Sequence, residues 1–122
     1  MIGASPHPGR PSHDVFEYLL GHGYDCVPIH PNARDVLGVT AFSTLAEATA
    51  ATGRFDVVDV FRRSEDCVTH AQEAVAGGAR CLWLQLGIVS PEAARIAAAG
   101  GLAVVMDRCM RIEHRRLADR AP

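Results

Sequence analysis

Apolar and polar residues alternate in blocks along this chain, and the blocks have the lengths of strands and helices. Short, mostly apolar runs rich in β-formers occupy residues 24–29, 55–61, 80–86 and 102–106. These runs do not alternate strictly between apolar and polar positions. We therefore expect strands that are buried on both faces, as in a parallel sheet.

Helical patterns lie between these runs. Apolar spacing predicts a helix over 15–20 that ends at Gly21 or Gly23, and a second over 64–75 that ends at Gly77–Gly78. The triplet 90–92 supplies an N-cap serine, a proline and an acidic residue, which predicts a third helix through Ala99. A weaker helix is predicted after Ser43, and a short extra strand over 39–42.

Alternation of strands and helices predicts an α/β fold of Rossmann-like type. We expect an open, mostly parallel five-stranded sheet with helices on both faces. Only Met1 and Ile2 precede Gly3, where a full first strand is expected, so we expect that strand to be truncated through a misplaced start. One domain is predicted over 1–117, with a frayed tail over 118–122.

Composition narrows the class of protein. The 122 residues carry a net charge of −2, which gives no reason to expect nucleic-acid binding. No apolar run approaches the ~20 residues of a membrane helix, and no signal-peptide pattern is seen, so we expect a cytoplasmic protein that does not bind membranes. The cysteines lack metal-site spacing, and Cys26, Cys67 and Cys81 are predicted to be reduced core residues.

Ligands of such sheets lie outside the carboxyl ends of the strands, so the segments after each strand are the candidate site. The first of them, residues 3–12, combines small residues with the start of a helix, which suits a phosphate. Gly3 permits a tight turn, and Ser5 and Ser12 offer hydroxyl donors. The loop is not G-x-G-x-x-G, so the dinucleotide fingerprint is absent. A capped, proline-rich turn without a ligand is the alternative.

The segments after the second and third strands carry charge. His30 stands where an NAD site needs Asp or Glu for the ribose hydroxyls, which counts against NAD. Asn32 and Arg34 could meet an adenine edge or a ribose phosphate; a plain polar turn is the alternative. Phe61 could pack on adenine and Arg62 could bind phosphate, unless they are a core aromatic beside a solvated charge.

Polar residues also mark the ends of the last two strands. Gln85 interrupts an apolar strand and needs partners, which either a ligand or neighbouring backbone could supply. Cys109 follows the last strand and could face a ligand thiol, or it could be inert.

Taken together, these segments resemble the CoA-binding domain family, in particular its small stand-alone members. The resemblance rests on IGAS-P-PGRPS, V-PIHPN, VVDVFRR, LWLQLG and VMDRCMRIEH, in order from Ile2 to about His114. It implies binding of coenzyme A rather than NAD, with phosphates on the loop after the first strand. The distant relatives carry a lysine in the turn after the second strand, which this chain lacks. The cofactor-binding positions predicted from the residues and the resemblance together are Gly3, Ala4, Ser5, Pro6, Arg10, Pro31, Asn32, Arg34, Phe61, Arg62, Leu84, Gln85, Leu86, Gly87 and Cys109.

The resemblance supports binding of CoA or an acyl-CoA and no catalysis by this chain alone, because no histidine matches the phosphohistidine of the synthetases. An NADP-dependent oxidoreductase or redox sensor is one alternative, since Arg34 could meet a 2′-phosphate. A CoA-binding subunit that acts in trans with an acyl-CoA synthetase is another, and a homo-oligomer is left open. Placement of Cys109 at the expected crevice further predicts a mixed disulfide with CoA under oxidation.

Overall fold

A parallel sheet forms the centre of the computed structural model, which describes residues 1–120. Its regular part has the order β3 (Val57–Val60), β4 (Cys81–Leu84) and β5 (Ala103–Val105). Val57 pairs with Cys81, and Cys81 pairs with Ala103. These strands lie within three of the predicted runs and confirm them. Each strand is shorter than the apolar run that predicted it.

Single parallel bridges continue the sheet beyond β3. Ile2 bridges Val60 on one side and Ile29 on the other, and Ile29 bridges Phe42. The segments therefore lie in the order Phe42, Ile29, Ile2, β3, β4, β5. This is the 3-2-1-4-5-6 order of dinucleotide-binding sheets, which confirms the Rossmann-like prediction. Strand order reverses between Ile2 and β3.

The predicted strand over 24–29 is only partly formed. Ile29 makes its bridges, but residues 24–28 have no regular strand pairing. Pro28 has no N–H to donate to a ladder. The Met1 ammonium donates to the Val27 carbonyl oxygen at 2.8 Å, and the Ile29 amide donates to the Met1 carbonyl at 2.9 Å.

Residues of the short strand predicted over 39–42 belong to two sheets. β2 (Val39–Thr40) pairs with β1 (Asp35–Val36), which was not predicted, in a small antiparallel hairpin. Its turn is Leu37–Gly38, with φ of 50° and 80°, as a two-residue hairpin turn requires. Phe42 then joins the main sheet through Ile29.

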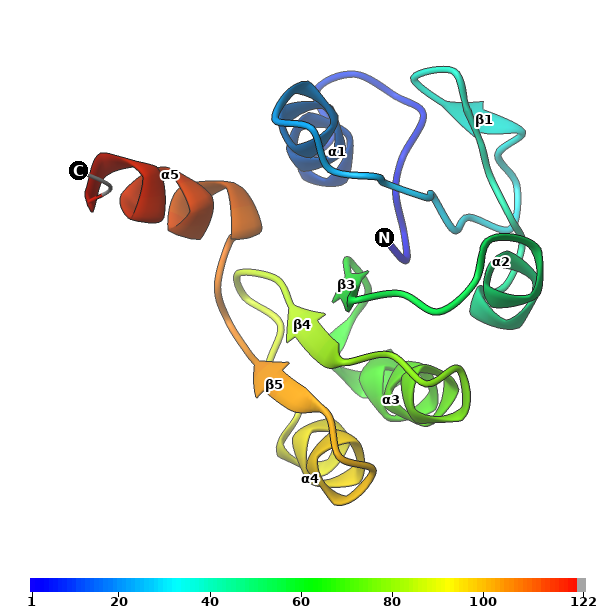
Figure 1. Cartoon of the computed structure of the whole chain (residues 1–122), viewed down its shortest axis with the longest axis vertical. Coiled ribbons are helices and arrows are strands. Elements are labelled where there is room, and N and C mark those ends of the chain that lie inside the picture. The colour runs from blue at the N-terminus through cyan, green and yellow to red at the C-terminus, as the bar shows by residue number, and fades with distance from the viewer. Residues whose placement is uncertain (121–122) are drawn as a thin grey trace.

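Helices cover both faces of the sheet. Figure 1 shows α1 and α5 on one side and α3 and α4 on the other. The bounds are α1 (Pro11–Gly21), α2 (Leu45–Thr52), α3 (Cys67–Ala76), α4 (Pro91–Ala99) and α5 (Met110–Arg120), with a 3-10 turn over Ser64–Asp66. Among residues 1–120, no helix has the length and apolar character needed to span a bilayer.

Two helix starts show how local chemistry sets the boundaries. The Ser90 hydroxyl accepts the Ala93 amide at 3.2 Å, which confirms the predicted N-cap. α2 begins one residue later than predicted, because Thr44 rather than Ser43 is the cap. The Thr44 hydroxyl accepts the Glu47 amide at 3.2 Å.

α5 was not predicted from the sequence. Most of its residues are charged, and its contacts with the rest of the fold include α1, where the Tyr18 hydroxyl and His114 Nδ1 lie 2.8 Å apart. The frayed tail was predicted to begin at residue 118, but α5 continues through Ala118 to Arg120. Residues 121–122 of the predicted tail lie outside the described residues.

The main core lies between the sheet and α3 and α4. Branched side chains from the sheet meet buried alanines of the two helices, which lets the helices lie close to the strands. The cysteines are free thiols; Cys67 is buried, and Cys26 and Cys81 are half-buried. The residues of this core with no exposed surface are Ala48, Val60, Cys67, Ala71, Ala74, Leu82, Leu84, Ala93 and Ala97.

Candidate ligand-binding groove at the switch point

A groove of about 800 Å³ lies where the strand order reverses. It opens beyond the carboxyl ends of the Ile2 segment and β3, the position at which open α/β sheets bind ligands. Basic, hydroxyl and small residues dominate its walls. They are Gly3, Ser5, His7, Arg10, Pro11, Ser12, His30, Pro31, Phe61, Arg62, Arg63, Asp66 and Ile88.

Gly3 sets the floor of the groove. Its φ is +84°, a left-handed conformation that side chains other than glycine disfavour. A Cβ here would overlap the Phe61 carbonyl oxygen and lie 3.1 Å from its carbonyl carbon. The chain can therefore turn away from the sheet this close to β3 only with glycine at position 3.

The loop from Gly3 to α1 is held by its own serines. The Ser12 hydroxyl accepts the Ser5 amide at 3.0 Å, and the Ser5 hydroxyl accepts the His7 amide at 3.1 Å. His13 Nδ1 donates to the Ser5 carbonyl oxygen at 2.9 Å. The loop is thus shaped before any ligand arrives.

The N-terminus of α1 faces this loop without a side-chain cap. Arg10 occupies the N-cap position and makes no capping hydrogen bond, and Pro11 has no N–H. The amides of Ser12 and His13 lie in the first turn, where no carbonyl of the helix can accept them. Together with the positive end of the helix dipole they favour an anion.

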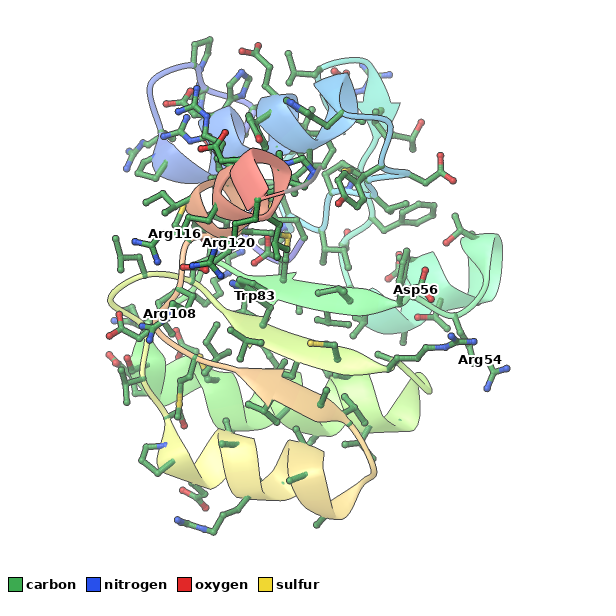
Figure 2. All side chains as sticks on the ribbon, turned by 60° about the vertical axis from the view of Figure 1, so that its left-hand side comes forward. Arg54, Asp56, Trp83, Arg108, Arg116 and Arg120 are labelled. Atoms are coloured by element: carbon green, nitrogen blue, oxygen red, sulfur yellow. The ribbon has the colours of Figure 1, made fainter. Side chains whose placement is uncertain are left out.

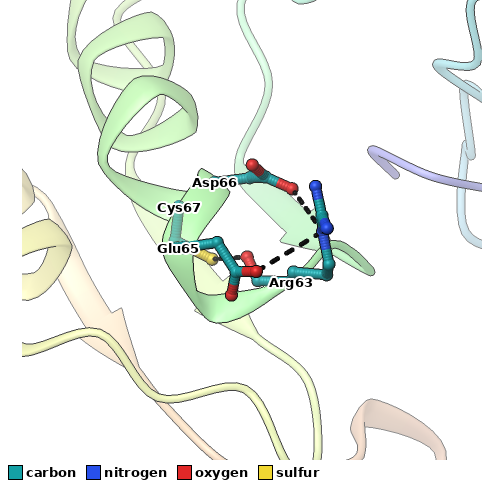
Figure 3. A network of polar contacts seen from close by, with 4 residues as sticks. All are labelled: Arg63, Glu65, Asp66 and Cys67. Carbon is teal, nitrogen blue, oxygen red and sulfur yellow. Dashed lines mark hydrogen bonds and ion pairs between the residues drawn. The ribbon is translucent and has the colours of Figure 1, made fainter.

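Guanidinium groups add positive charge to the groove. Within residues 1–120, neither Arg10 nor Arg62 forms an ion pair. Arg63 differs, because its Nε lies 3.3 Å from Asp66 Oδ2 and 3.6 Å from Glu65 Oε1. Figure 3 shows its side chain turned toward these two carboxylates. Arg10 and Arg62 are therefore the cations available to an anionic ligand.

His30 lines the groove at the end of the second sheet segment. Burial lowers the pKa of its imidazole, and the nearby positive charges of Arg62 and His7 lower it further. Its Nδ1 accepts the Asn32 amide at 3.1 Å, which places the proton on Nε2. An acidic residue that would bind ribose hydroxyls is absent from this position.

The groove gathers Gly3, Ser5, Arg10, Pro31, Phe61 and Arg62 from the predicted set. Other members of that set do not line it. Two of them are apolar core residues: Ala4 in a small cluster with Phe16 and Val36, and Leu84 in the main core. The remaining ones outside the lining are Pro6, Asn32, Arg34, Gln85, Leu86, Gly87 and Cys109.

Gln85 has protein partners for its side chain. Its Nε2 donates to Asp59 Oδ1 at 2.6 Å, and its Oε1 accepts the Met110 amide at 3.3 Å. The structure thus favours the alternative in which neighbouring protein groups satisfy the buried amide. In the loop that follows, Leu86 is exposed and the Gly87 amide donates to Asp107 Oδ1 at 2.7 Å.

The predicted binding set left out seven residues that line the groove. They are His7, Pro11, Ser12, His30, Arg63, Asp66 and Ile88. His7, Pro11 and Ser12 belong to the segment 3–12 that the sequence already marked as a candidate, and this position was the available signal. Ile88 lies four residues beyond β4, and no pattern in the sequence marks it as part of the wall.

Known proteins match this arrangement over most of the chain. The model of the CoA binding domain matches residues 1–115. The chain belongs to the CoA-binding domain family. It is 37% identical over 114 residues to the uncharacterized protein YneT of Bacillus subtilis, covering 93% of this chain and 82% of that protein.

Solved structures agree with the membership. A hypothetical protein from Pyrococcus horikoshii is 35% identical with a TM-score of 0.89, covering 96% of this chain and 80% of the other. A dinucleotide-forming acetyl-coenzyme A synthetase from Candidatus Korarchaeum cryptofilum has a TM-score of 0.70 at 17% identity, covering 87% of this chain and 25% of the other. The second likeness concerns the fold alone.

Proposed function

We propose that the protein binds coenzyme A or an acyl-CoA in the switch-point groove, with the phosphates at the N-terminus of α1. The observation that carries the proposal is the uncapped first turn of α1 beside two unpaired guanidinium groups. Family membership supports CoA as the ligand, and the groove supplies charge of the matching sign.

Each part of CoA has a proposed neighbour. The pyrophosphate accepts from the Ser12 and His13 amides, and Arg10 and Arg62 bind the remaining phosphate oxygens, the 3′-phosphate included. Phe61 offers an apolar wall to the adenine. His30 stands at the strand end where an NAD site needs an acidic residue for the ribose hydroxyls, so the position favours CoA over NAD.

Several predicted positions lie outside the groove, and we propose that they contact parts of the ligand that extend beyond it. Asn32 and Arg34 follow Pro31 and are exposed, so they are proposed to approach the adenosine end. Leu86, Gly87 and Cys109 follow β4 and β5, and we assign them to the pantetheine arm. No catalytic residue is proposed. The alternative that the protein acts together with a separate acyl-CoA synthetase is supported only by a likeness in fold. Co-purification from native cells tests it.

Thermal unfolding with added ligands tests the proposal. CoA at 100 times its Kd adds about 2.7 kcal/mol of stability, which raises the melting temperature by several degrees. Dephospho-CoA should give a smaller shift because it lacks the 3′-phosphate. A shift with NADP and none with CoA would instead identify a nicotinamide-cofactor protein.

Two neighbouring arginines provide a matched pair for the same assay. Arg62→Gln removes an unpaired cation and should weaken CoA binding about tenfold, since a charge-assisted hydrogen bond contributes ~1.5–3 kcal/mol. Arg63→Gln removes a cation already paired with Glu65 and Asp66 and should change affinity less than threefold. Equal losses from the two variants would contradict the assignment.

A further inference from the structure

Two histidines and an arginine line the switch-point groove without an acidic partner. His7 comes from the loop before α1, His30 from the end of the second sheet segment, and Arg62 from the segment after β3. None of the three forms an ion pair with a carboxylate of residues 1–120. We call these three residues the His–Arg cluster.

The other charged residues of the groove do not balance this cluster. Asp66 is the one carboxylate among the described lining residues, and its Oδ2 already lies 3.3 Å from Arg63 Nε. Arg10 adds a further cation at the start of α1. The charged groups that line the groove with His30 are therefore cations, a second histidine and a carboxylate that is already paired. An anionic ligand would compensate this excess of positive charge.

Charges of opposite sign lie together elsewhere in the molecule. On α3, His70 Nδ1 lies 3.1 Å from Glu73 Oε1. Figure 2 shows Arg54 and Asp56 at the amino end of β3, the edge of the sheet opposite the groove. There Arg80 Nε lies 3.8 Å from Asp56 Oδ1. The whole chain has a net charge of −2, so the excess of cations in the groove is a local feature.

His30 can bind an anion in either of its protonation states. The neutral ring carries its proton on Nε2, because Nδ1 accepts the Asn32 amide at 3.1 Å. Burial lowers the pKa of His30, and the charges of Arg62 and His7 lower it further, which favours the neutral ring. A phosphate dianion beside the ring opposes these effects. It attracts an imidazolium by about 4 kcal/mol per unit charge at ~4 Å, which exceeds the ~1 kcal/mol of the Asn32 hydrogen bond that protonation breaks.

We propose that the His–Arg cluster binds a phosphate monoester dianion, and that His30 takes up a proton from solvent as the dianion binds. Arg62, His7 and the Nε2–H of His30 donate to its oxygens. The inference rests on the proposed function for its ligand, since the 3′-phosphate of CoA is a monoester and the pyrophosphate is not. NADP carries the same group at its 2′ position, so the ligand class is a phosphate monoester on a ribose.

Calorimetric titrations with CoA and dephospho-CoA at about pH 8 and pH 6.5 test the proposal. The ratio of the two affinities isolates the contribution of the monoester. We expect CoA to be preferred at both pH values, and the preference to rise about fivefold at the lower pH, since one unit of pKa corresponds to a tenfold change. A subsite made of arginines alone gives a preference that stays level or falls, because a phosphate monoester itself gains a proton near pH ~6.

His30→Gln and His70→Gln form a matched pair for this experiment. Glutamine at position 30 can donate an N–H but takes up no proton, so the preference for CoA should persist at about pH 8 and no longer rise at the lower pH. His70 lies outside the groove and already pairs with Glu73, so His70→Gln should keep the rise. Equal pH trends in the two variants would overturn the role of His30.

NADP and NAD provide a second pair of ligands, which separates this inference from the proposed function. If CoA does not bind, and NADP is preferred over NAD with the same pH trend, the monoester subsite stands and the CoA proposal fails. If CoA binds but dephospho-CoA binds equally well, or the preference does not rise as the pH falls, the subsite is overturned and the CoA proposal stands. The subsite is also overturned if none of the four ligands binds.

Discussion

Replacement of Gly3 by alanine probes the turn that forms the floor of the switch-point groove. Two costs arise. A left-handed φ costs a residue with a Cβ about 1–2 kcal/mol, and the overlap with the Phe61 carbonyl forces a backbone shift that costs a further ~1–3 kcal/mol. Alanine also restricts the unfolded chain, which returns about 0.4–1 kcal/mol. The net loss of stability for Gly3→Ala is then about 2–4 kcal/mol.

Gly9 separates these two costs. Its φ of +89° matches that of Gly3, but a Cβ at Gly9 would meet no atom within 4 Å. Gly9→Ala therefore carries the conformational cost without the overlap, and we expect it to lose about 1 kcal/mol or less. The difference between the two variants isolates the close approach of the loop to β3.

Urea unfolding without ligand measures this difference directly. The midpoint of Gly3→Ala should fall well below that of Gly9→Ala, and the melting temperatures should differ by roughly 5–10 °C. CoA affinity should also drop about tenfold in Gly3→Ala, because the shift displaces Phe61 from the groove wall. Equal stability of the two variants would contradict this prediction, since it would mean that the Phe61 carbonyl leaves room for a Cβ at position 3.

Three further predictions follow from single contacts. Burial raises the pKa of Asp59 to about 6, so the folded protein holds this proton more tightly than the unfolded chain. As the pH rises from about 4 to 6, the free energy of unfolding should fall by roughly 2–3 kcal/mol. Asp59→Asn should remove this fall when unfolding is measured at several pH values. Thr44→Ala should cost about 1 kcal/mol in urea unfolding and Ser43→Ala close to none, because only Thr44 caps α2. Burial raises the pKa of the Cys26, Cys67 and Cys81 thiols, so CoA disulfide should modify Cys109 first. In intact-mass analysis, an unmodified Cys109 or equal labelling of all four cysteines would contradict this prediction.

The sequence predicts this fold best where local signals agree with packing. Three apolar runs become β3, β4 and β5, and Ser90 caps α4 as expected. The run over 24–29 was predicted from a similar apolar pattern, yet Pro28 has no N–H for a ladder and Ile29 makes only single bridges. Tyr24 and Asp25 are exposed, so the pattern marks buried residues only at its end, at Pro28 and Ile29.

α5 shows a different limit. Charged residues dominate its sequence, and its contacts with α1 include a polar pair, Tyr18 of α1 and His114 of α5. Few of its residues are apolar, and the tertiary contact with α1 shows what holds the helix in place.

The candidate site was predictable in part for a physical reason. Parallel strands bring their carboxyl ends to one edge, so Gly3, Arg10 and Arg62 could be assigned to a common site from their positions alone. Which side chains then meet depends on rotamers and loop paths. Gln85 turned toward Asp59 and Met110, and Arg63 toward two carboxylates, neither of which strand order determines.

Titration of ¹⁵N-labelled protein with CoA tests the proposed phosphate site at the N-terminus of α1. We expect the largest backbone amide shifts on Ser12 and His13, with further shifts over residues 3–10 and 61–63. The amides at the amino ends of β3, β4 and β5 should stay unchanged. CoA binding accompanied by shifts confined to other parts of the molecule, with Ser12 and His13 unaffected, would contradict the proposed phosphate site.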